Sequence, residues 1–226
     1  MKRKGDVSFD KRFFSKNLDS FKETSYKDRF SYIYKTNHWV GKNTVSGEGS
    51  EKSQTKEIQD KLPKIISELQ IKSMLDLPCG DFNWMKDIGL DLDDYIGGDI
   101  VPEIIEKNVI KYSNSKRKFK QLDIIEGTLP MVDLIFCRDC LVHFSNDNIL
   151  KSFENLKNTG SKYILTTTFT ECDENIDIVT GDWRIINLTL APFKLPEPLQ
   201  IINENCTEGD GAFSDKSLGL WNISDL

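Results

Sequence analysis

Acidic side chains recur through the middle of the chain, each at or just after the end of a short apolar run: Asp76, Asp99, Asp123 and Asp139. In an open parallel sheet a ligand binds beyond the carboxyl ends of the strands, so the residues that end strands are placed to meet it. An ionised carboxylate accepts hydrogen bonds from both hydroxyls of a ribose, and Asp99 is suited to that role. Asp123 is placed to accept a hydrogen bond from the amino group of an adenine. The pattern therefore predicts a nucleoside site.

The first of these runs ends in DLPCGDF, residues 76–82, a turn that holds a single glycine. A dinucleotide site needs G-x-G-x-x-G so that the backbone closes on a pyrophosphate, and Pro78 stands where the first glycine would be. The turn therefore favours a nucleoside without phosphates. Because the edge is acidic, it would also attract a sulfonium cation, and the predicted cofactor is S-adenosylmethionine (SAM).

The strands and helices that position these residues can be predicted from the residue pattern. After residue 71, short apolar runs alternate with stretches that have helical spacing of apolar residues. Such alternation is typical of a parallel sheet built from strand–helix units. The last two apolar runs are joined by the glycine-rich TEGDGAFSD, which predicts a hairpin. The predicted strands are Ser73–Leu77, Tyr95–Gly98, Phe119–Leu122, Val132–Cys137, Lys162–Thr168, Leu199–Asn203 and Ser217–Ile223.

At this point the chain resembles a known family. MLDLPCGDFNWM, YIGGDI, QLDII and VDLIFCRDCLVHFS are similar, in order and spacing, to the four motifs of class I SAM-dependent methyltransferases. The likeness covers about residues 55–226, with Pro78 in place of a glycine and Asp81-Phe82 in place of small residues. It implies an α/β, Rossmann-like three-layer sandwich whose mostly parallel seven-stranded sheet has the order 3-2-1-4-5-7-6 and an antiparallel C-terminal hairpin. It also implies methyl transfer from SAM, with S-adenosyl-L-homocysteine (SAH) as the product.

The strand ends and the resemblance together define the expected cofactor contacts. One further contact comes from the N-terminal segment, where residues 33–39 and 46–50 are similar to a segment that folds over the cofactor in bacterial methyltransferases. The alternative is that Trp39 anchors the core and that the Gly-Ser run is a flexible loop. The predicted cofactor-binding residues are Asp76, Pro78, Cys79, Gly80, Asp99, Ile100, Asp123, Ile124, Cys137, Arg138 and Trp39.

Two residues after the fourth predicted strand, Asp139 and His143, are the candidate catalytic groups. Either would suit a general base that faces the methyl acceptor. The alternative for His143 is a hydrogen bond to backbone at a helix entry. A strong base is not obligatory, because placing the nucleophile in line with an activated methyl group supplies much of the rate.

The stretch 171–198 is too long for a plain connection and predicts a lid. Within it, Trp183 and Arg184 could bind a flat or anionic acceptor, or they could pin the lid to the body. The spacing of Cys137 and Cys140 also matches a C-x-x-C redox or zinc motif, but there is no second pair. Two small apolar fillers are the expected alternative, and no metal site is predicted.

Composition limits the remaining choices. The 226 residues are 38% hydrophobic and 29% charged, which suits one globular domain. We divide it into an N-terminal arm, 1–50, that covers the cofactor site, and a SAM-binding methyltransferase domain, 51–226. The net charge is +4 over residues 1–60 but −10 over residues 61–226. An acidic body disfavours a nucleic-acid partner.

We therefore expect a small-molecule or glycan acceptor and no nucleic acid. A nucleic-acid methyltransferase, a non-catalytic SAM-binding module and a thiol-based regulator remain as alternatives. The five irregularly spaced cysteines are typical of reduced thiols, and no apolar run approaches the length of a membrane span. These features predict a soluble protein of the cytoplasm.

Overall fold

The seven-stranded sheet has the order β3-β2-β1-β4-β5-β7-β6 in the computed structural model, which describes residues 5–226. β7 runs antiparallel to both of its neighbours, and the other neighbouring pairs are parallel. The predicted topology is confirmed, and each predicted strand end lies within two residues of the observed one. The strands are β1 (Ser73–Asp76), β2 (Asp94–Asp99), β3 (Arg117–Gln121), β4 (Leu134–Cys137), β5 (Tyr163–Phe169), β6 (Gln200–Asn203) and β7 (Lys216–Asn222).

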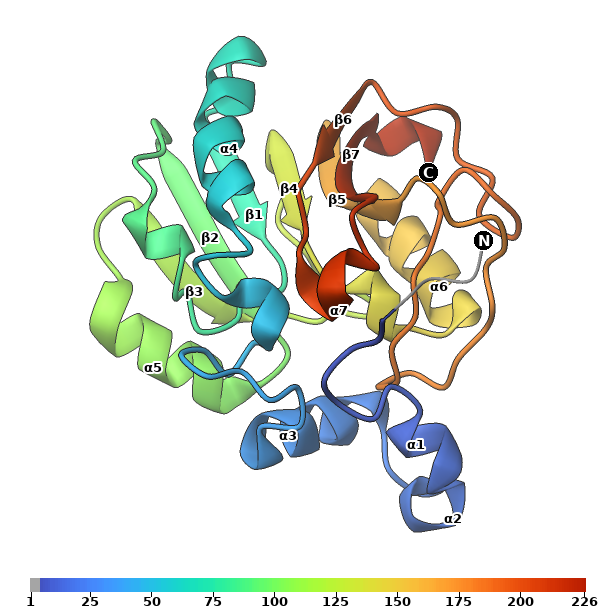
Figure 1. The fold of residues 1–226 in the computed structure, drawn as a ribbon. Helices are drawn as coiled ribbons and strands as arrows, with labels where there is room; N and C mark the ends of the chain where they lie inside the picture. The colour runs from blue at the N-terminus through green and yellow to red at the C-terminus, as the bar shows by residue number, and fades with distance from the viewer. Residues whose placement is uncertain (1–4) are drawn as a thin grey trace.

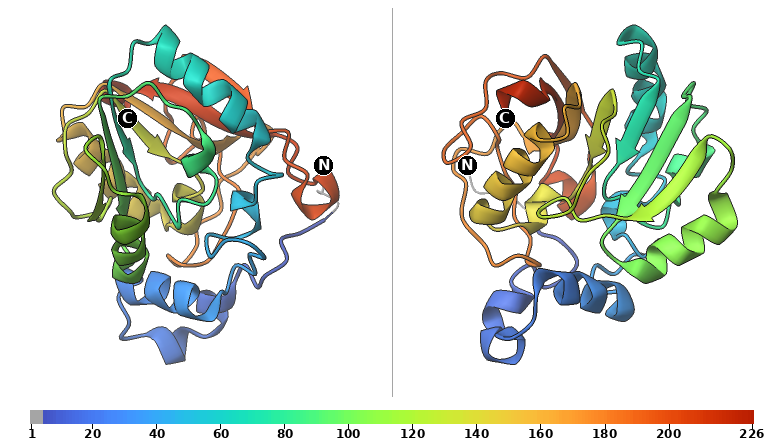
Figure 2. Two further views of the ribbon diagram at one scale, coloured as in Figure 1. Left: turned by 90° about the vertical axis from the view of Figure 1, so that its left-hand side faces the viewer. Right: turned by 180° about the vertical axis from the view of Figure 1, so that it is seen from behind.

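Helices cover both faces of the sheet and make it the middle of three layers (Figures 1 and 2). Three long helices, α4 (Lys56–Glu68), α5 (Pro102–Tyr112) and α6 (Asn146–Lys157), follow the amphipathic stripes of the sequence. The shorter elements are η1 (Glu48–Ser50), η2 (Met85–Asp87), η3 (Leu141–His143), α7 (Glu208–Gly211) and η4 (Ile223–Asp225).

Alternate residues of the strands enter two separate cores. In β4, Leu134 and Phe136 pack with the buried face of α4, whereas Ile135 and Cys137 pack with that of α6. Successive side chains of a strand point to opposite faces, so a strand buried on both faces reads as a continuous apolar run. This is why the strands were recognisable in the sequence.

The N-terminal arm contains more regular structure than we predicted. It forms α1 (Phe13–Lys16), α2 (Leu18–Phe21) and the longer α3 (Tyr26–Thr36), which lie beyond one end of the sheet (Figure 1). A capping box starts α3: Ser25 accepts a hydrogen bond from the Asp28 backbone N–H, and the Asp28 side chain accepts one from the Ser25 N–H. The arm thus contains a capped helix that our sequence analysis did not predict.

The stretch 171–198, all of which the structure describes, contains neither helix nor strand, yet it is well packed. Ile178, Ile186 and Leu188 are buried. The Asp182 carboxylate accepts hydrogen bonds from the backbone N–H groups of Phe14 and Ser15 and so ties the stretch to α1. Over residues 5–226 no helix is both long and apolar enough to cross a membrane.

Candidate functional site

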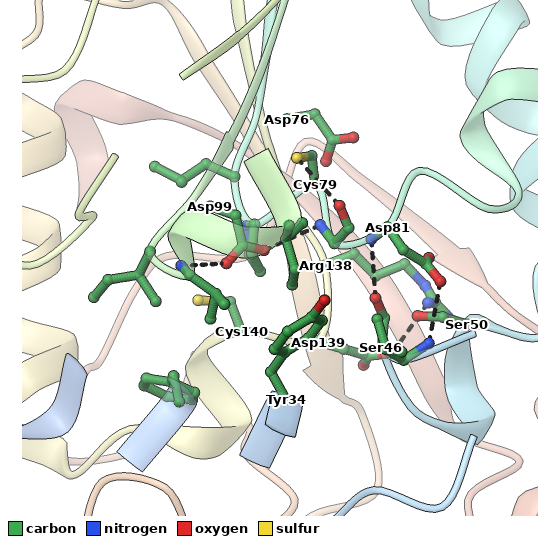
Figure 3. A pocket seen from close by; sticks show the side chains of 18 of the residues that line it. Tyr34, Ser46, Ser50, Asp76, Cys79, Asp81, Asp99, Arg138, Asp139 and Cys140 are labelled. Atoms are coloured by element: carbon green, nitrogen blue, oxygen red, sulfur yellow. Dashed lines mark hydrogen bonds and ion pairs between the residues drawn. The ribbon is translucent and has the colours of Figure 1, made fainter. Parts of the chain in front are cut away.

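One cavity lies at the carboxyl ends of β1, β2 and β4 and beside the loop that follows β3. It contains about 1060 Å³ of space between atoms, part of it open to solvent. Figure 3 shows Asp76 and Asp99 on the sheet side and Tyr34 and Ser46 of the arm on another. We call this the strand-end cavity. Its polar and charged lining residues include Tyr34, Ser46, Ser50, Asp76, Asp81, Asn83, Asp99, Asp123, Arg138, Asp139 and His143.

Asp99 ends β2 and is fixed by backbone. One carboxylate oxygen accepts a hydrogen bond from the Val101 N–H at 2.9 Å and the other from the Gly80 N–H at 3.2 Å. Each oxygen keeps a further lone pair for a ligand. Burial raises the pKa of Asp99 to about 6, against the opposing effect of these N–H donors. The side chain is therefore oriented before any ligand arrives.

Asp76 ends β1, and its carboxylate accepts a hydrogen bond from the buried Tyr95 hydroxyl. Burial raises the pKa of Asp76 to about 7. Within residues 5–226 neither Asp76 nor Asp99 forms an ion pair with a basic side chain. The charge of Arg138 lowers the pKa of Asp76 only in part, so a cationic ligand would further stabilise the ionised form of both buried carboxylates.

The first turn brings the arm against the sheet. Gly80 has a φ of 53°, and a Cβ there would lie 2.2 Å from the Ser46 Oγ, so the close approach requires glycine. The Asp81 carboxylate accepts hydrogen bonds from the Thr44 hydroxyl and the Val45 N–H. Phe82 packs among aromatic rings beneath the turn. The residues that depart from the family motif thus anchor the arm and the core.

Asp123 connects the loop after β3 to the arm. Its carboxylate accepts a hydrogen bond from the Tyr26 hydroxyl at 2.8 Å and pairs with the Lys27 ammonium at 2.8 Å. Burial would raise the pKa of Asp123, but Lys27 and Tyr26 outweigh it and lower the pKa. At the other end of α3 the Lys107 ammonium donates to the Tyr34 hydroxyl. The helix therefore spans from the loop after β3 to α5.

A buried ion network follows β4. Arg138 pairs with Glu204 at 2.8 Å and with Asp139 at 3.1 Å, and Lys216 pairs with Asp139 at 2.7 Å. Burial would raise the pKa of Asp139, but the charges of Arg138 and Lys216 lower it to about 2. Asp139 also has a φ of 52°, an uncommon backbone conformation for a residue other than glycine. It is a fixed anion and a weak proton acceptor.

His143 is buried, and its Nδ1 lies 3.0 Å from the Asp182 backbone oxygen. Only a protonated nitrogen donates to a carbonyl, so Nε2 of the neutral ring is an acceptor. Burial lowers the pKa of His143 to about 4, which keeps the ring neutral at physiological pH. The ring stacks on Trp39, with centroids 4.4 Å apart.

The structure brings most of the predicted site residues to this cavity. The lining includes the four acidic strand-end residues and Pro78, Cys79, Gly80, Ile100, Ile124, Arg138, Trp39 and His143. Cys137 does not line it, because in β4 its side chain points into the α6 core; Cys140 lines it instead. Tyr34 and Ser46 also line the cavity. They lie in the segments 33–39 and 46–50 that the resemblance placed over the cofactor, but they were not among the individual residues predicted to bind it.

Trp183 and Arg184 lie away from the strand-end cavity. The Arg184 guanidinium is buried and donates to the backbone oxygens of Leu141 and Ile176 and to the Asn146 side chain. We had predicted that Arg184 binds the substrate; these contacts favour the alternative, that Arg184 pins the stretch to the body. Trp183 lines a separate pocket, described below.

Cys137 and Cys140 of the C-x-x-C are buried thiols that form no disulfide, and the other three cysteines are buried as well. Burial is among the causes that raise the pKa of Cys140, and the largest is its hydrogen bond with Cys137. Over the described residues there is no cluster of three or more His, Cys, Asp or Glu side chains that could hold a metal. Nothing in this geometry supports reactive thiolates.

The sheet order, the antiparallel ending and the cavity define a class I SAM-dependent methyltransferase fold. Comparison with solved structures agrees. The N-methyltransferase NodS from Bradyrhizobium japonicum WM9, in complex with SAH, matches with a TM-score of 0.60 and 14% identity over 84% of this chain and 97% of that chain.

The methyltransferase domain of bacterial CtHen1-CN matches with a TM-score of 0.53 and 11% identity over 76% of this chain and 100% of that chain. Human N-acetylserotonin methyltransferase in complex with SAM matches with a TM-score of 0.50 and 15% identity over 90% of this chain and 68% of that chain. No family model and no curated protein matches the sequence. At these identities the likeness establishes the fold.

Proposed function

We propose that the protein transfers a methyl group from SAM to a small-molecule or glycan acceptor and releases SAH. The observation that carries the proposal is the convergence of Asp76, Asp99 and Asp123 on one cavity beside a turn without phosphate-binding glycines. The donor set fits a cationic nucleoside, because the two carboxylates with raised pKa form no ion pair within residues 5–226, and the charge of Arg138 only partly offsets the effect of burial on Asp76. NodS and the human enzyme hold SAH and SAM in structures of the same fold.

Each lining residue has a role in this proposal. Asp99 accepts hydrogen bonds from the ribose hydroxyls, and Asp123 accepts one from the adenine amino group. Ile100 and Ile124 supply apolar surface on either side of the base. The turn at Pro78, Cys79 and Gly80, with Asp76 and Arg138 behind it, surrounds the methionine portion, and Trp39 closes the cavity from the arm.

SAM, when bound, supplies a methyl group already activated on a sulfonium. We had predicted Asp139 or His143 as a general base that faces the acceptor; we propose that both act on the acceptor side, and both are weak bases. Their contribution is therefore to position the acceptor and to accept its hydrogen bonds, and alignment supplies much of the rate.

The arm, 1–50, is proposed to cover the bound cofactor, since α3 is tied to Asp123 and to α5. We had predicted that residues 171–198 form a lid over the domain 51–226. Their burial favours a fixed wall instead. A location in the cytoplasm stays a prediction.

Calorimetry with SAM tests the proposal. Asp99→Ala should weaken SAM binding at least about tenfold, because each charge-assisted hydrogen bond to a ribose hydroxyl contributes about 1.5–3 kcal/mol. Asp91→Ala is the matched control, since the Asp91 side chain is 94% exposed. Equal loss in both variants, or tighter binding of NAD than of SAM, contradicts the proposal.

Turnover separates the two remaining alternatives. A non-catalytic SAM-binding module would bind SAM but label no acceptor from methyl-labelled SAM. A nucleic-acid methyltransferase would label RNA or DNA in preference to small molecules. The charge of −10 over residues 61–226 favours the small acceptor.

A further inference from the structure

A second pocket adjoins the strand-end cavity and shares part of its wall. Trp39, Ser46, Asp139 and His143 line both spaces. The second pocket contains about 590 Å³ of space between atoms, part of it open to solvent. Its remaining lining residues are Val7, Phe9, Gly47, Glu48, Gly49, Phe169, Trp183, Glu208, Phe213 and Lys216.

Aromatic rings form much of its wall. Trp183 packs edge to face against Phe213, with ring centroids 5.2 Å apart, and Trp39 lines both this pocket and the strand-end cavity. The Trp39 Nε1–H is buried and has no hydrogen-bond partner within residues 5–226. A buried donor without a partner is costly, so this N–H is suited to a polar atom of a ligand.

The charges of the second pocket are unbalanced. Glu48, Asp139 and Glu208 contribute three carboxylates, and Lys216 is the one basic residue in its lining over the described part of the chain. Lys216 lies 2.7 Å from Asp139 and 3.7 Å from Glu208, so it is already shared. Arg138, next to the pocket, is balanced by Glu204.

Glu48 is the carboxylate without a counter-charge. It is half-buried and forms no ion pair within residues 5–226. A carboxylate without an ion pair in a pocket that is also lined by aromatic rings suits an organic ammonium ion, through Coulomb attraction and cation–π contacts.

We propose that the second pocket binds the methyl acceptor and that this acceptor is a small amine carried on a flat apolar group. The inference rests on the proposed methyl transfer, because the shared wall places this pocket next to the cofactor. The ammonium pairs with Glu48, the flat group packs against Trp183, and His143 Nε2 accepts a hydrogen bond from the amine.

The reaction requires the unprotonated amine. The ammonium loses one proton to water through the half-buried Glu48. The nitrogen lone pair then forms the new N–C bond while the C–S bond of the sulfonium breaks and its electron pair stays on sulfur. The products are a methylated ammonium and the neutral thioether of SAH.

The test is binding of three probes that share one ring and differ in charge: 2-phenylethylamine, 2-phenylethanol and 3-phenylpropionate. Calorimetry is done on the full chain saturated with SAH, so that no turnover occurs. The amine should bind about tenfold more tightly than the alcohol, and the carboxylate should bind least.

Glu48→Gln should remove the preference for the amine, whereas the exposed Glu23→Gln should keep it. Trp183→Leu should weaken the amine and the alcohol alike. SAH affinity should not change in any of these variants. Because the Glu48 carboxylate forms no ion pair within residues 5–226, Glu48→Gln should leave the fold intact and tests the charge assignment even if Trp183→Leu is unstable.

The outcomes separate the two proposals. If SAH fails to bind the wild-type chain, the proposed function is wrong. If SAH binds but the alcohol or the carboxylate binds as tightly as the amine, the amine assignment is overturned and the proposed function stands. An amine preference that survives in Glu48→Gln overturns the assignment of the second pocket.

Discussion

In the strand-end cavity, Asp76 and Asp99 are buried and form no ion pair with a basic side chain of residues 5–226, and burial raises the pKa of each. On the wall shared with the second pocket, Asp139 contacts both Arg138 and Lys216, and its pKa is lowered. Asp76 and Asp99 are suited to bind a cationic ligand, whereas Asp139 is already paired with Arg138 and Lys216. The difference shows that acidic residues at or just after the ends of neighbouring strands can have different roles: some are available to a ligand, and others are held in ion pairs of the fold.

The largest expected difference is in stability. Asp139→Asn should lower the free energy of unfolding by about 3 kcal/mol, because it removes from a buried ion network the carboxylate nearest to Lys216 and one of the two carboxylate partners of Arg138. Glu204 and Glu208 are then the carboxylates that remain beside the two cations. The pKa of Asp139 is lowered on folding, so its stabilisation is present above pH 3.8 and lost as the pH falls through 2. Urea unfolding at pH 8 measures the effect.

Asp76→Asn should act in the opposite direction and raise the free energy of unfolding at pH 8 by about 1 kcal/mol. The pKa of Asp76 is raised, so its contribution to stability is complete below pH 3.8 and is lost as the pH rises through 7. Asp10→Asn is the control, since the Asp10 pair with Lys16 is exposed and should contribute less than about 1 kcal/mol. If Asp76→Asn and Asp139→Asn destabilise the protein equally, the proposed difference between the two carboxylates is wrong.

The next effect is the pH dependence of cofactor binding. A sulfonium and an ammonium favour ionised carboxylates, so SAM should release protons as it binds and should bind roughly tenfold more weakly at pH 6 than at pH 8. Calorimetry in two buffers of different ionisation enthalpy counts the protons released.

SAH provides the control for this experiment, because its sulfur is uncharged. Its affinity should change by no more than about threefold over the same range. If SAM and SAH show the same pH dependence, the sulfonium does not sense Asp76 and Asp99, and the first half of the comparison is wrong.

The two regions also differ in how far the sequence predicted them. Asp76 and Asp99 follow strands that are buried on both faces, so an apolar run and its last residue mark the edge of the sheet locally. The topology places those strand ends together. Asp99 and Gly80 could therefore be predicted as site residues without knowledge of contacts between distant parts of the chain. Cys137 was assigned to the cavity although alternation along β4 directs its side chain to the core.

The parts of the site that the N-terminal arm and β7 contribute could not be predicted in the same way. Lys216 meets Asp139 across 77 positions of the chain, and Thr44 meets Asp81 across 37, and no local pattern pairs them. One local signal was present: Ser25 and Asp28 have the spacing of a capping box and mark the start of α3. That helix carries Tyr34, which the strand-end pattern could not find.

The smallest expected effect concerns the contact between the arm and the sheet edge. Tyr26→Phe removes the hydroxyl that donates to Asp123 and leaves the exposed Lys27 as the remaining arm contact on that carboxylate. A neutral hydrogen bond contributes about 0.5–1.5 kcal/mol, so α3 should detach more often and the dissociation rate of SAM should rise by roughly threefold to tenfold. Stopped-flow displacement of SAM by excess SAH measures this rate. Tyr32→Phe is the matched control, because Tyr32 lies on the same helix and packs against Phe13 and Phe21 rather than against Asp123. If Tyr26→Phe changes the dissociation rate no more than Tyr32→Phe does, α3 does not retain the cofactor. The strand-end carboxylates would then hold SAM without help from the arm.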